Sequence, residues 1–135
     1  ALLFVIHGDY ARALKDCDRA IHIEKHHPDY YLTRARAYIG LHQDAKALKD
    51  LSRAIALDDQ NSEYRLERAA QLTKERKFKN ALEDVSVALE QDEDNCDALR
   101  LRAKIYHGMK KLTLAKHDLK RVKEITDALH NGPLD

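Results

Sequence analysis

A four-residue motif recurs along this chain at a constant interval of 34 residues. Ala-Leu-Lys-Asp stands at residues 13–16 and 47–50, and it returns as Ala-Leu-Glu-Asp at residues 81–84. A looser copy, Ala-Lys-His-Asp, occupies residues 115–118. Further alanines keep the same interval, namely Ala20, Ala54, Ala88 and Ala35, Ala69, Ala103. A fixed period of this length predicts a stack of similar units, each packed against its neighbours.

Within each period, the apolar residues follow helical spacing in two runs separated by a short polar break. Tyr31, Ala35 and Tyr38 form one such stripe, and residues 47–55 carry the next. Composition agrees with helix, because the 135 residues include only four Gly and two Pro. We expect helices near residues 1–7, 9–25, 29–41, 44–58, 62–75, 78–91, 96–109 and 112–130. The sequence therefore predicts an all-α chain of antiparallel helix pairs.

The recurring positions resemble the tetratricopeptide repeat, whose pattern places Trp, Leu, Gly, Tyr, Ala, Phe, Ala and Pro at set spacings over the same length. The small slot holds Ala1, Ala35, Ala69 and Ala103, and the Phe slot holds Cys17, Leu51, Val85 and Leu119. The chain departs from the pattern at the Trp slot, which holds Tyr31, Arg65 and Leu99, and at the Leu slot, which holds arginine.

The resemblance implies a right-handed superhelical solenoid of antiparallel helix pairs over residues 1–131. In this interpretation residues 1–27 are a truncated first repeat, and the full repeats are 28–61, 62–95 and 96–131. Residues 132–135 are a C-terminal tail. We expect further residues upstream, because the chain begins within what reads as the first helix of a hairpin.

Arginine and aspartate also recur with the period, and each aspartate follows its arginine by sixteen residues. The pairs are Arg34 with Asp50, Arg68 with Asp84, and Arg102 with Asp118. Because both members repeat together, we predict structural ion pairs, either within one hairpin or between neighbouring hairpins. Half-buried pairs of this kind fix geometry more than they add stability.

The resemblance also implies where a partner binds. In such solenoids the first helix of each hairpin lines a concave groove, and partner contacts come from slots that packing does not need. These slots hold Leu2, Val5, Leu32, Arg36, Ile39, Leu66, Ala70, Thr73, Arg100, Lys104 and His107, with Lys74 beside them. Their character changes from apolar to basic along the chain. We expect a protein partner, an extended peptide or a helix, that carries an acidic and an apolar segment.

One subgroup of the family grips the acidic tails of heat-shock chaperones through a clamp of Lys, Asn and Arg. The matching slots of the three full hairpins hold Leu32, Arg36, Thr33, Asp97 and Leu101. The frame one repeat earlier gives Leu2, Thr33, Glu63 and Glu67. The clamp is absent in both frames, so clamp-type binding is not expected. A scaffold, an adaptor or another kind of co-chaperone stays compatible with the pattern.

No group of residues predicts catalysis or a cofactor. His22 and His26 are spaced to share one helix face, but no acidic or cysteine ligand completes a metal site. Cys17 falls in a packing slot, which predicts a buried thiol rather than a nucleophile. The acidic run 92–97 lacks the central Gly and the final Glu of a calcium loop, so we interpret it as a turn with a helix cap. We therefore expect a protein that is not an enzyme.

Net charge and hydropathy add constraints on partners. The 24 Lys and Arg against 23 Asp and Glu leave a net charge of +1, which gives no reason to expect nucleic-acid binding. No apolar run approaches the roughly 20 residues of a membrane span. We expect a cytoplasmic protein without a membrane partner.

The two ends of the chain carry apolar residues. Residues 2–6 form an apolar edge, through which we expect contact with further repeats or self-association. The last helix carries a stripe that we expect to serve as its own cap, formed by Leu119, Val122, Ile125 and Leu129. An alternative to partner binding is a purely structural role, in which these repeats belong to a longer superhelix that positions other domains.

Overall fold

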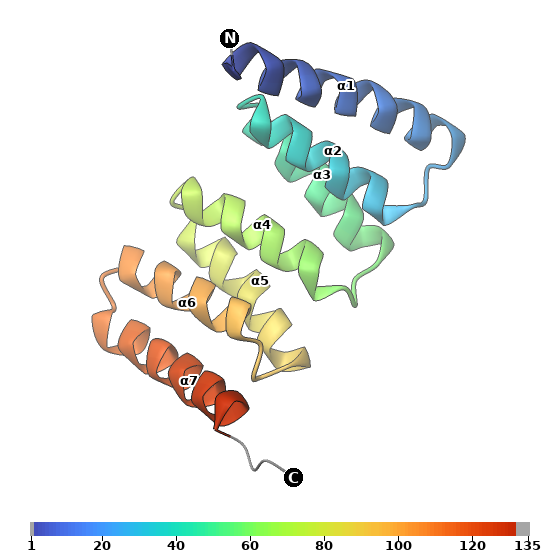
Figure 1. Cartoon of the computed structure of the whole chain (residues 1–135). Helices are drawn as coiled ribbons and strands as arrows, with labels where there is room; N and C mark the ends of the chain where they lie inside the picture. The colour runs from blue at the N-terminus through green and yellow to red at the C-terminus, as the bar shows by residue number, and fades with distance from the viewer. Residues whose placement is uncertain (1, 132–135) are drawn as a thin grey trace. The chain divides into compact units, whose positions relative to one another are not determined.

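The computed structural model describes the backbone of residues 2–131 and the side chains of residues 8–131. Within that part the chain forms seven α-helices and no strand (Figure 1). They are α1 (Leu2–Ile23), α2 (Pro28–Gly40), α3 (Asp44–Leu57), α4 (Ser62–Lys74), α5 (Phe78–Gln91), α6 (Cys96–Gly108) and α7 (Leu112–His130). The all-α prediction is confirmed, and the bounds of α2 to α7 lie within one residue of those expected. None of these helices combines the length and the apolar character that a membrane crossing needs.

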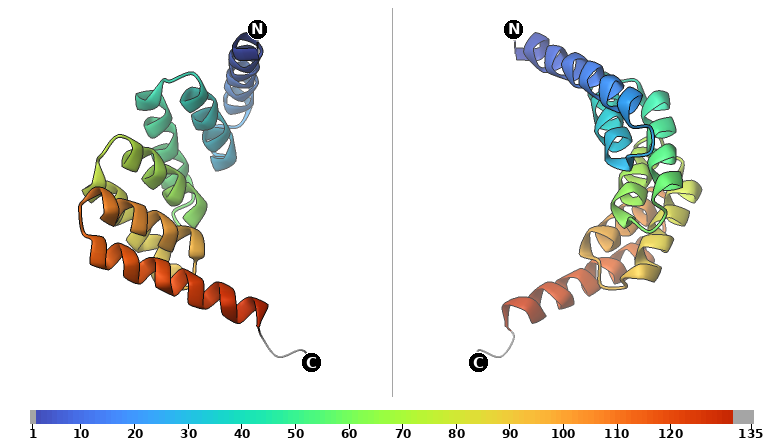
Figure 2. Two further views of the ribbon diagram at one scale, coloured as in Figure 1. Left: turned by 60° about the vertical axis from the view of Figure 1, so that its left-hand side comes forward. Right: turned by 90° about the vertical axis from the view of Figure 1, so that its right-hand side faces the viewer.

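The first helix corrects a prediction. Residues 1–7 and 9–25 were expected to form two helices with a turn at Gly8, but α1 runs unbroken from Leu2 to Ile23. Both views of Figure 2 show it as one continuous helix. A glycine inside a helix costs only about 1 kcal/mol relative to alanine, so Gly8 permits a turn without forcing one.

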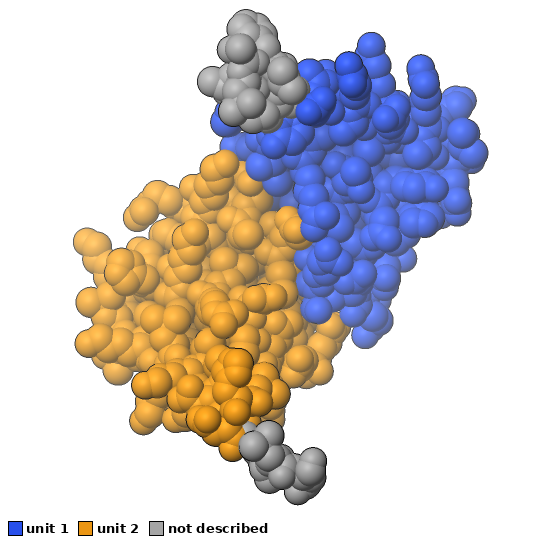
Figure 3. Space-filling view, viewed as in Figure 1, with its two compact units in different colours: residues 1–64 blue, residues 65–135 orange. Residues whose placement is uncertain are grey.

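The chain divides into two compact units, residues 1–64 and residues 65–135 (Figure 3). In the first unit α2 packs against both α1 and α3, and α2 and α3 form a hairpin. Its core joins aromatic and aliphatic side chains around alanines, and Ala35, Ala47 and Ala54 are fully buried. Small side chains at these positions let the helix backbones approach closely. These three recurring alanines are therefore packing positions of the first unit.

In the second unit α6 packs against both α5 and α7. Ala69, Ala81 and Ala88 are fully buried, as their counterparts in the first unit are. Asn95 caps α6, because its side-chain oxygen accepts a hydrogen bond from the Ala98 backbone N–H at 3.1 Å. The acidic run 92–97 is therefore a turn that leads into a capped helix.

Aromatic rings pack on glycines where the helices of neighbouring hairpins meet inside each unit. A Cβ added to Gly40 would lie 2.4 Å from the ring of Tyr10, and one added to Gly108 would lie 2.5 Å from the ring of Phe78. Both glycines are needed for this close approach rather than for a special backbone angle.

The turns inside the three hairpins share one backbone conformation. His42, Arg76 and Lys110 each have a positive φ, of 59°, 60° and 62°. After α2 the N–H of Gln43 bonds to the carbonyl of Tyr38 at 2.8 Å, and that of His42 bonds to the carbonyl of Ile39 at 3.0 Å. This is the Schellman arrangement, and it recurs after α4 and α6. The left-handed residue lies at the same slot in each of the three full repeats.

Candidate partner-binding surface

Three buried ion pairs fix the geometry of the hairpins. Arg34 in α2 donates from Nε and Nη2 to the two carboxylate oxygens of Asp50 in α3, both at 2.8 Å. Arg68 donates to Asp84 at 2.7 Å twice, and Arg102 donates to Asp118 at 2.8 and 2.7 Å. Every arginine thus contacts the aspartate sixteen residues later, and each pair joins the two helices of one hairpin.

The aspartates of these pairs are withdrawn from solvent, whereas the arginines are partly exposed. The side chains of Asp50, Asp84 and Asp118 are 6%, 4% and 3% exposed. The hydrogen bond to Asp118 raises the pKa of Arg102 above its ordinary value, although burial acts in the opposite direction. Arg34 donates in addition to Asp18 in α1 at 3.0 Å, so one guanidinium holds three helices together. The arginine slot therefore serves first to join the helices of its hairpin.

The predicted groove residues of the first unit divide between surface and core. Arg36 is exposed and pairs with Glu63 at 3.2 Å, and Ile39 is half-buried. Leu32 is only 4% exposed, because it belongs to the core cluster with Tyr31 and Tyr64. Leu2 and Val5 lie outside the residues whose side chains the structure describes.

The second unit presents two cations and a histidine on one side of α6. Arg100, Lys104 and His107 follow one another at helical spacing, and all three are exposed. Arg100 makes an exposed ion pair with Asp97 at 3.4 Å. We name these three residues the α6 basic face. This part of the predicted groove is open to solvent.

The other predicted groove residues of this unit lie on α4. Ala70 and Lys74 are exposed and Leu66 is half-buried. Thr73 is 7% exposed, and its hydroxyl donates to the carbonyl of Ala69 at 2.7 Å. Thr73 and Leu32 are therefore corrections to the predicted surface, because their side chains are enclosed by neighbouring helices.

The apolar stripe predicted on the last helix is only partly covered. Val122 is buried, but Leu119 is 51% exposed and Leu129 is 81% exposed. The expected self-cap is therefore wrong for these two residues. Leu129 lies near the end of α7, which has 19 residues and extends beyond the 13-residue α6. Leu119 occupies a slot in which Leu51 and Val85 are fully buried.

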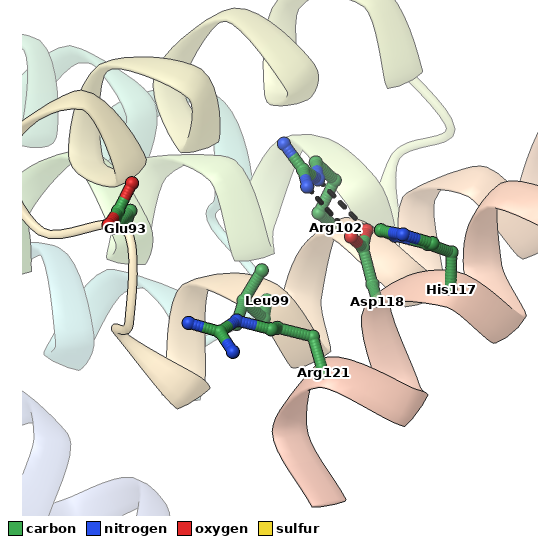
Figure 4. A pocket seen from close by; sticks show the side chains of 6 residues that line it. All are labelled: Glu93, Leu99, Arg102, His117, Asp118 and Arg121. Atoms are coloured by element: carbon green, nitrogen blue, oxygen red, sulfur yellow. Dashed lines mark hydrogen bonds and ion pairs between the residues drawn. The ribbon is translucent and has the colours of Figure 1, made fainter. Parts of the chain in front are cut away.

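A pocket of about 250 Å³ lies between α6 and α7, and the sequence interpretation did not find it (Figure 4). It is lined by Glu93, Leu99, Arg102, His117, Asp118 and Arg121. The sequence offered one signal for this pocket, because Leu99 has the smallest side chain of the three residues in the Trp slot.

Among the side chains of residues 8–131, no three His, Cys, Asp or Glu gather closely enough to hold a metal ion.

Tyr64 and Cys17 are the other groups whose environment shifts their acidity. Burial, and then the hydrogen bond that Tyr64 donates to Asp29 at 2.5 Å, raises the pKa of Tyr64 well above its ordinary value. Burial likewise raises the pKa of the Cys17 thiol, which is 7% exposed. A thiol that stays protonated inside a packing slot is not a nucleophile.

Comparison with known proteins agrees with this architecture. The sequence pattern of the tetratricopeptide repeat matches residues 4–70, whereas no curated protein sequence matches the chain. MamA from Desulfovibrio magneticus RS-1 is similar with a TM-score of 0.79 at 18% identity, covering 92% of this chain and 73% of that one.

Two solved tetratricopeptide domains are also similar. The first such domain of Spaghetti (RPAP3), bound to an HSP90 peptide, gives a TM-score of 0.68 at 21% identity and covers 73% of this chain and 78% of that one. The domain of Arabidopsis OM64 gives 0.67 at 22% identity, with 73% and 81% covered. The 34-residue period, the hairpins with buried alanines and the match over residues 4–70 lead to one conclusion: this part of the chain consists of tetratricopeptide repeats.

Proposed function

We propose that this protein is an interaction module that binds an extended peptide or a helix of another protein along the first helices of its hairpins. The observation that carries the proposal is the α6 basic face. Arg100, Lys104 and His107 gather on one exposed side of α6, although the chain as a whole has a net charge of only +1. Such a local excess of positive charge favours the binding of an acidic segment and speeds its diffusional encounter with the protein.

The partner's apolar part is supported by the other groove residues. In the second unit Ala70 on α4 is exposed and Leu66 is half-buried, so both add apolar surface to that unit. A peptide that combines acidic and apolar residues would satisfy both kinds of surface. The RPAP3 domain provides a parallel within the fold, since it was solved with an HSP90 peptide.

The test uses two peptides and two charge reversals. A fluorescent 12-residue peptide that alternates Glu and Leu is titrated by fluorescence polarisation, and the HSP90 peptide SRMEEVD is the comparison. Because the clamp residues are missing, SRMEEVD should bind at least tenfold more weakly. Lys104→Glu should weaken binding of the Glu-Leu peptide at least tenfold. Lys120→Glu, an exposed change on α7, should not.

The outcome decides between a specific face and general charge attraction. Equal weakening by Lys104→Glu and Lys120→Glu would contradict the proposal, because both variants change the net charge equally. Binding should also fall steeply between 50 and 300 mM salt, since exposed charges are screened over about 10 Å at 0.1 M.

A second candidate function is favoured by the exposed slot on α7. Leu119 is 51% exposed, whereas Leu51 and Val85 at the equivalent positions are fully buried. A helix packed on α7 would cover it, as expected for a structural stretch of a longer superhelix. In that case Leu119→Asp changes the assembly state in sedimentation velocity, and Lys104→Glu changes nothing. Partner binding predicts the reverse.

A further inference from the structure

One position between the paired helices, which we call the seat, holds a different residue in each hairpin, namely Tyr31, Arg65 and Leu99. In the first unit the ring of Tyr31 occupies it and is 7% exposed. The Tyr31 hydroxyl donates to the carbonyl of Lys25 at 2.8 Å. The guanidinium carbons of Arg34 and Arg53 lie 5.6 and 5.9 Å from the ring centroid, so two cations lie over the ring.

The seat of the middle hairpin holds an arginine. Arg65 stands 34 residues after Tyr31, and its side chain is 18% exposed. Its Nη1 lies 3.7 Å from a carboxylate oxygen of Asp84, the partner of Arg68. This hairpin therefore fills the position with a long side chain of its own.

The seat of the last hairpin is open. Leu99 stands at the Tyr31 position, and its short side chain leaves the 250 Å³ pocket described above. The residues around it are the two-period counterparts of those around Tyr31: Glu93 for Lys25, Arg102 for Arg34, and Arg121 for Arg53. In Figure 4 the side chain of Arg121 extends from α7 beside Leu99.

Arg102 repeats only one of the two ring contacts that Arg34 makes. The Arg34 guanidinium lies over Tyr31 and also over Tyr38, at 5.9 Å. The Arg102 guanidinium lies over Tyr106 at 5.8 Å, but the position of the second ring is vacated by Leu99. The pocket thus keeps the cationic surroundings of an aromatic ring without the ring itself.

We propose that this pocket binds the phenol ring of a tyrosine side chain from a partner protein. Its volume is below the roughly 300–1,000 Å³ of pockets for drug-sized ligands and suits one ring. The cations Arg102 and Arg121 flank the ring, and the backbone carbonyl of Glu93 accepts the hydroxyl, as Lys25 accepts that of Tyr31. The site is separate from the α6 basic face, so the proposal does not rest on the proposed function.

The charges around the pocket oppose an anionic ligand. Arg102 already donates two hydrogen bonds to Asp118. Arg121 pairs with Asp94 at 2.6 Å and with Glu124 at 3.8 Å. With Glu93 and Asp118 in the wall, a carboxylate or a phosphate meets like charge and cations that are already neutralised. A neutral phenol ring meets no like charge in this pocket, and its one hydroxyl donor matches the acceptor at Glu93.

The experiment follows ligand binding by ¹H–¹⁵N NMR with the peptide Gly-Gly-Tyr-Gly-Gly. Shift changes should centre on Leu99, Arg102 and Arg121. The peptide with Phe in place of Tyr should bind about fivefold more weakly, because it lacks the hydroxyl. Leu99→Tyr should fill the pocket with the chain's own ring, raise the Tm, and reduce peptide binding at least tenfold. Arg121→Ala should weaken binding about threefold through loss of one cation.

A matched gain-of-site variant uses the first unit. Tyr31→Leu recreates the Leu99 arrangement between Arg34 and Arg53, so it should add a second set of shift changes there. The proposal is overturned if no shifts centre on Leu99, or if Leu99→Tyr folds and binds as well as the original chain. Binding of p-cresol without binding of the tyrosine peptide would also overturn it, because the pocket would then take free phenols only. Should Leu99→Tyr not fold, Arg121→Ala and Tyr31→Leu decide the question.

Discussion

Replacing Arg34 with leucine is expected to destabilise the protein, although leucine is the usual residue of the repeat pattern at that slot. Substitutions toward a family pattern commonly add about 0.5–2 kcal/mol of stability. Here the arginine donates two hydrogen bonds to Asp50, which is 4% exposed. Arg34→Leu therefore leaves a carboxylate without its partner in the core of the first unit.

The magnitude follows from that buried carboxylate. Removing one member of a buried ion pair costs about 3–5 kcal/mol. The destabilisation that comes from the unpaired charge cannot exceed about 4 kcal/mol, because protonating an ordinary aspartate at pH 7 costs about that much. We therefore expect Arg34→Leu to lower the free energy of unfolding by about 3–4 kcal/mol. Asp50→Ala should cost less, because Arg34 is 21% exposed and keeps its contact with Asp18.

The assay is urea unfolding followed by circular dichroism, arranged as a double-mutant cycle. The combined Arg34→Leu and Asp50→Ala variant should lie within about 2 kcal/mol of the original chain, which implies a coupling energy of at least about 1 kcal/mol. Arg36→Leu is the matched control, because its exposed pair with Glu63 contributes no more than about 1 kcal/mol. An Arg34→Leu protein as stable as the original would refute the reasoning, and so would a double variant no better than Arg34→Leu alone.

Three further predictions concern acidity and packing. The raised pKa of Tyr64 favours folding below about pH 10, where an unfolded tyrosine ionises, and this contribution is lost as pH rises further. The original chain should therefore lose up to about 1.4 kcal/mol per pH unit above pH 10 relative to Tyr64→Phe, measured by urea unfolding at pH 8 and 11. Gly108→Ala should cost about 1–3 kcal/mol in the same assay despite the better helix propensity of alanine, because the added Cβ meets the Phe78 ring; an unchanged midpoint would reject that contact. Cys17 should react with a disulfide reagent at least tenfold more slowly than the half-buried Cys96, and equal rates in native buffer would show that its slot opens.

The sequence was sufficient to predict those features that repeat. Arg34 and Asp50 could be paired in advance because both return with the period, and α2 to α7 could be bounded because the period carries the boundaries of one repeat over to the next. Gly8 misled the prediction, since glycine is compatible with a turn and also with the interior of a helix. Periodicity could not show that Leu32 is enclosed, because the stripe that faces a groove borders directly on the stripe that packs.

The candidate site was predicted less completely than the fold. The α6 basic face was expected from the groove slots that the family resemblance implies, and its three residues share one side of a helix. The pocket at Leu99 depends on the volume that a side chain leaves between two helices, and no spacing rule reports volume. Only the comparison of Leu99 with Tyr31 and Arg65 at the same slot brings it to light.

The left-handed turns have a consequence for how this chain can change. His42, Arg76 and Lys110 hold a conformation that costs an ordinary residue roughly 1–2 kcal/mol relative to glycine. Glycine would relieve that strain, but its freedom in the unfolded chain takes back about 0.5–1 kcal/mol. At the middle of both ranges, the three turns together therefore hold a reserve of about 2 kcal/mol that glycine would release. This reserve would let the protein tolerate a destabilising change elsewhere, for example one that adapts a binding face to a new partner.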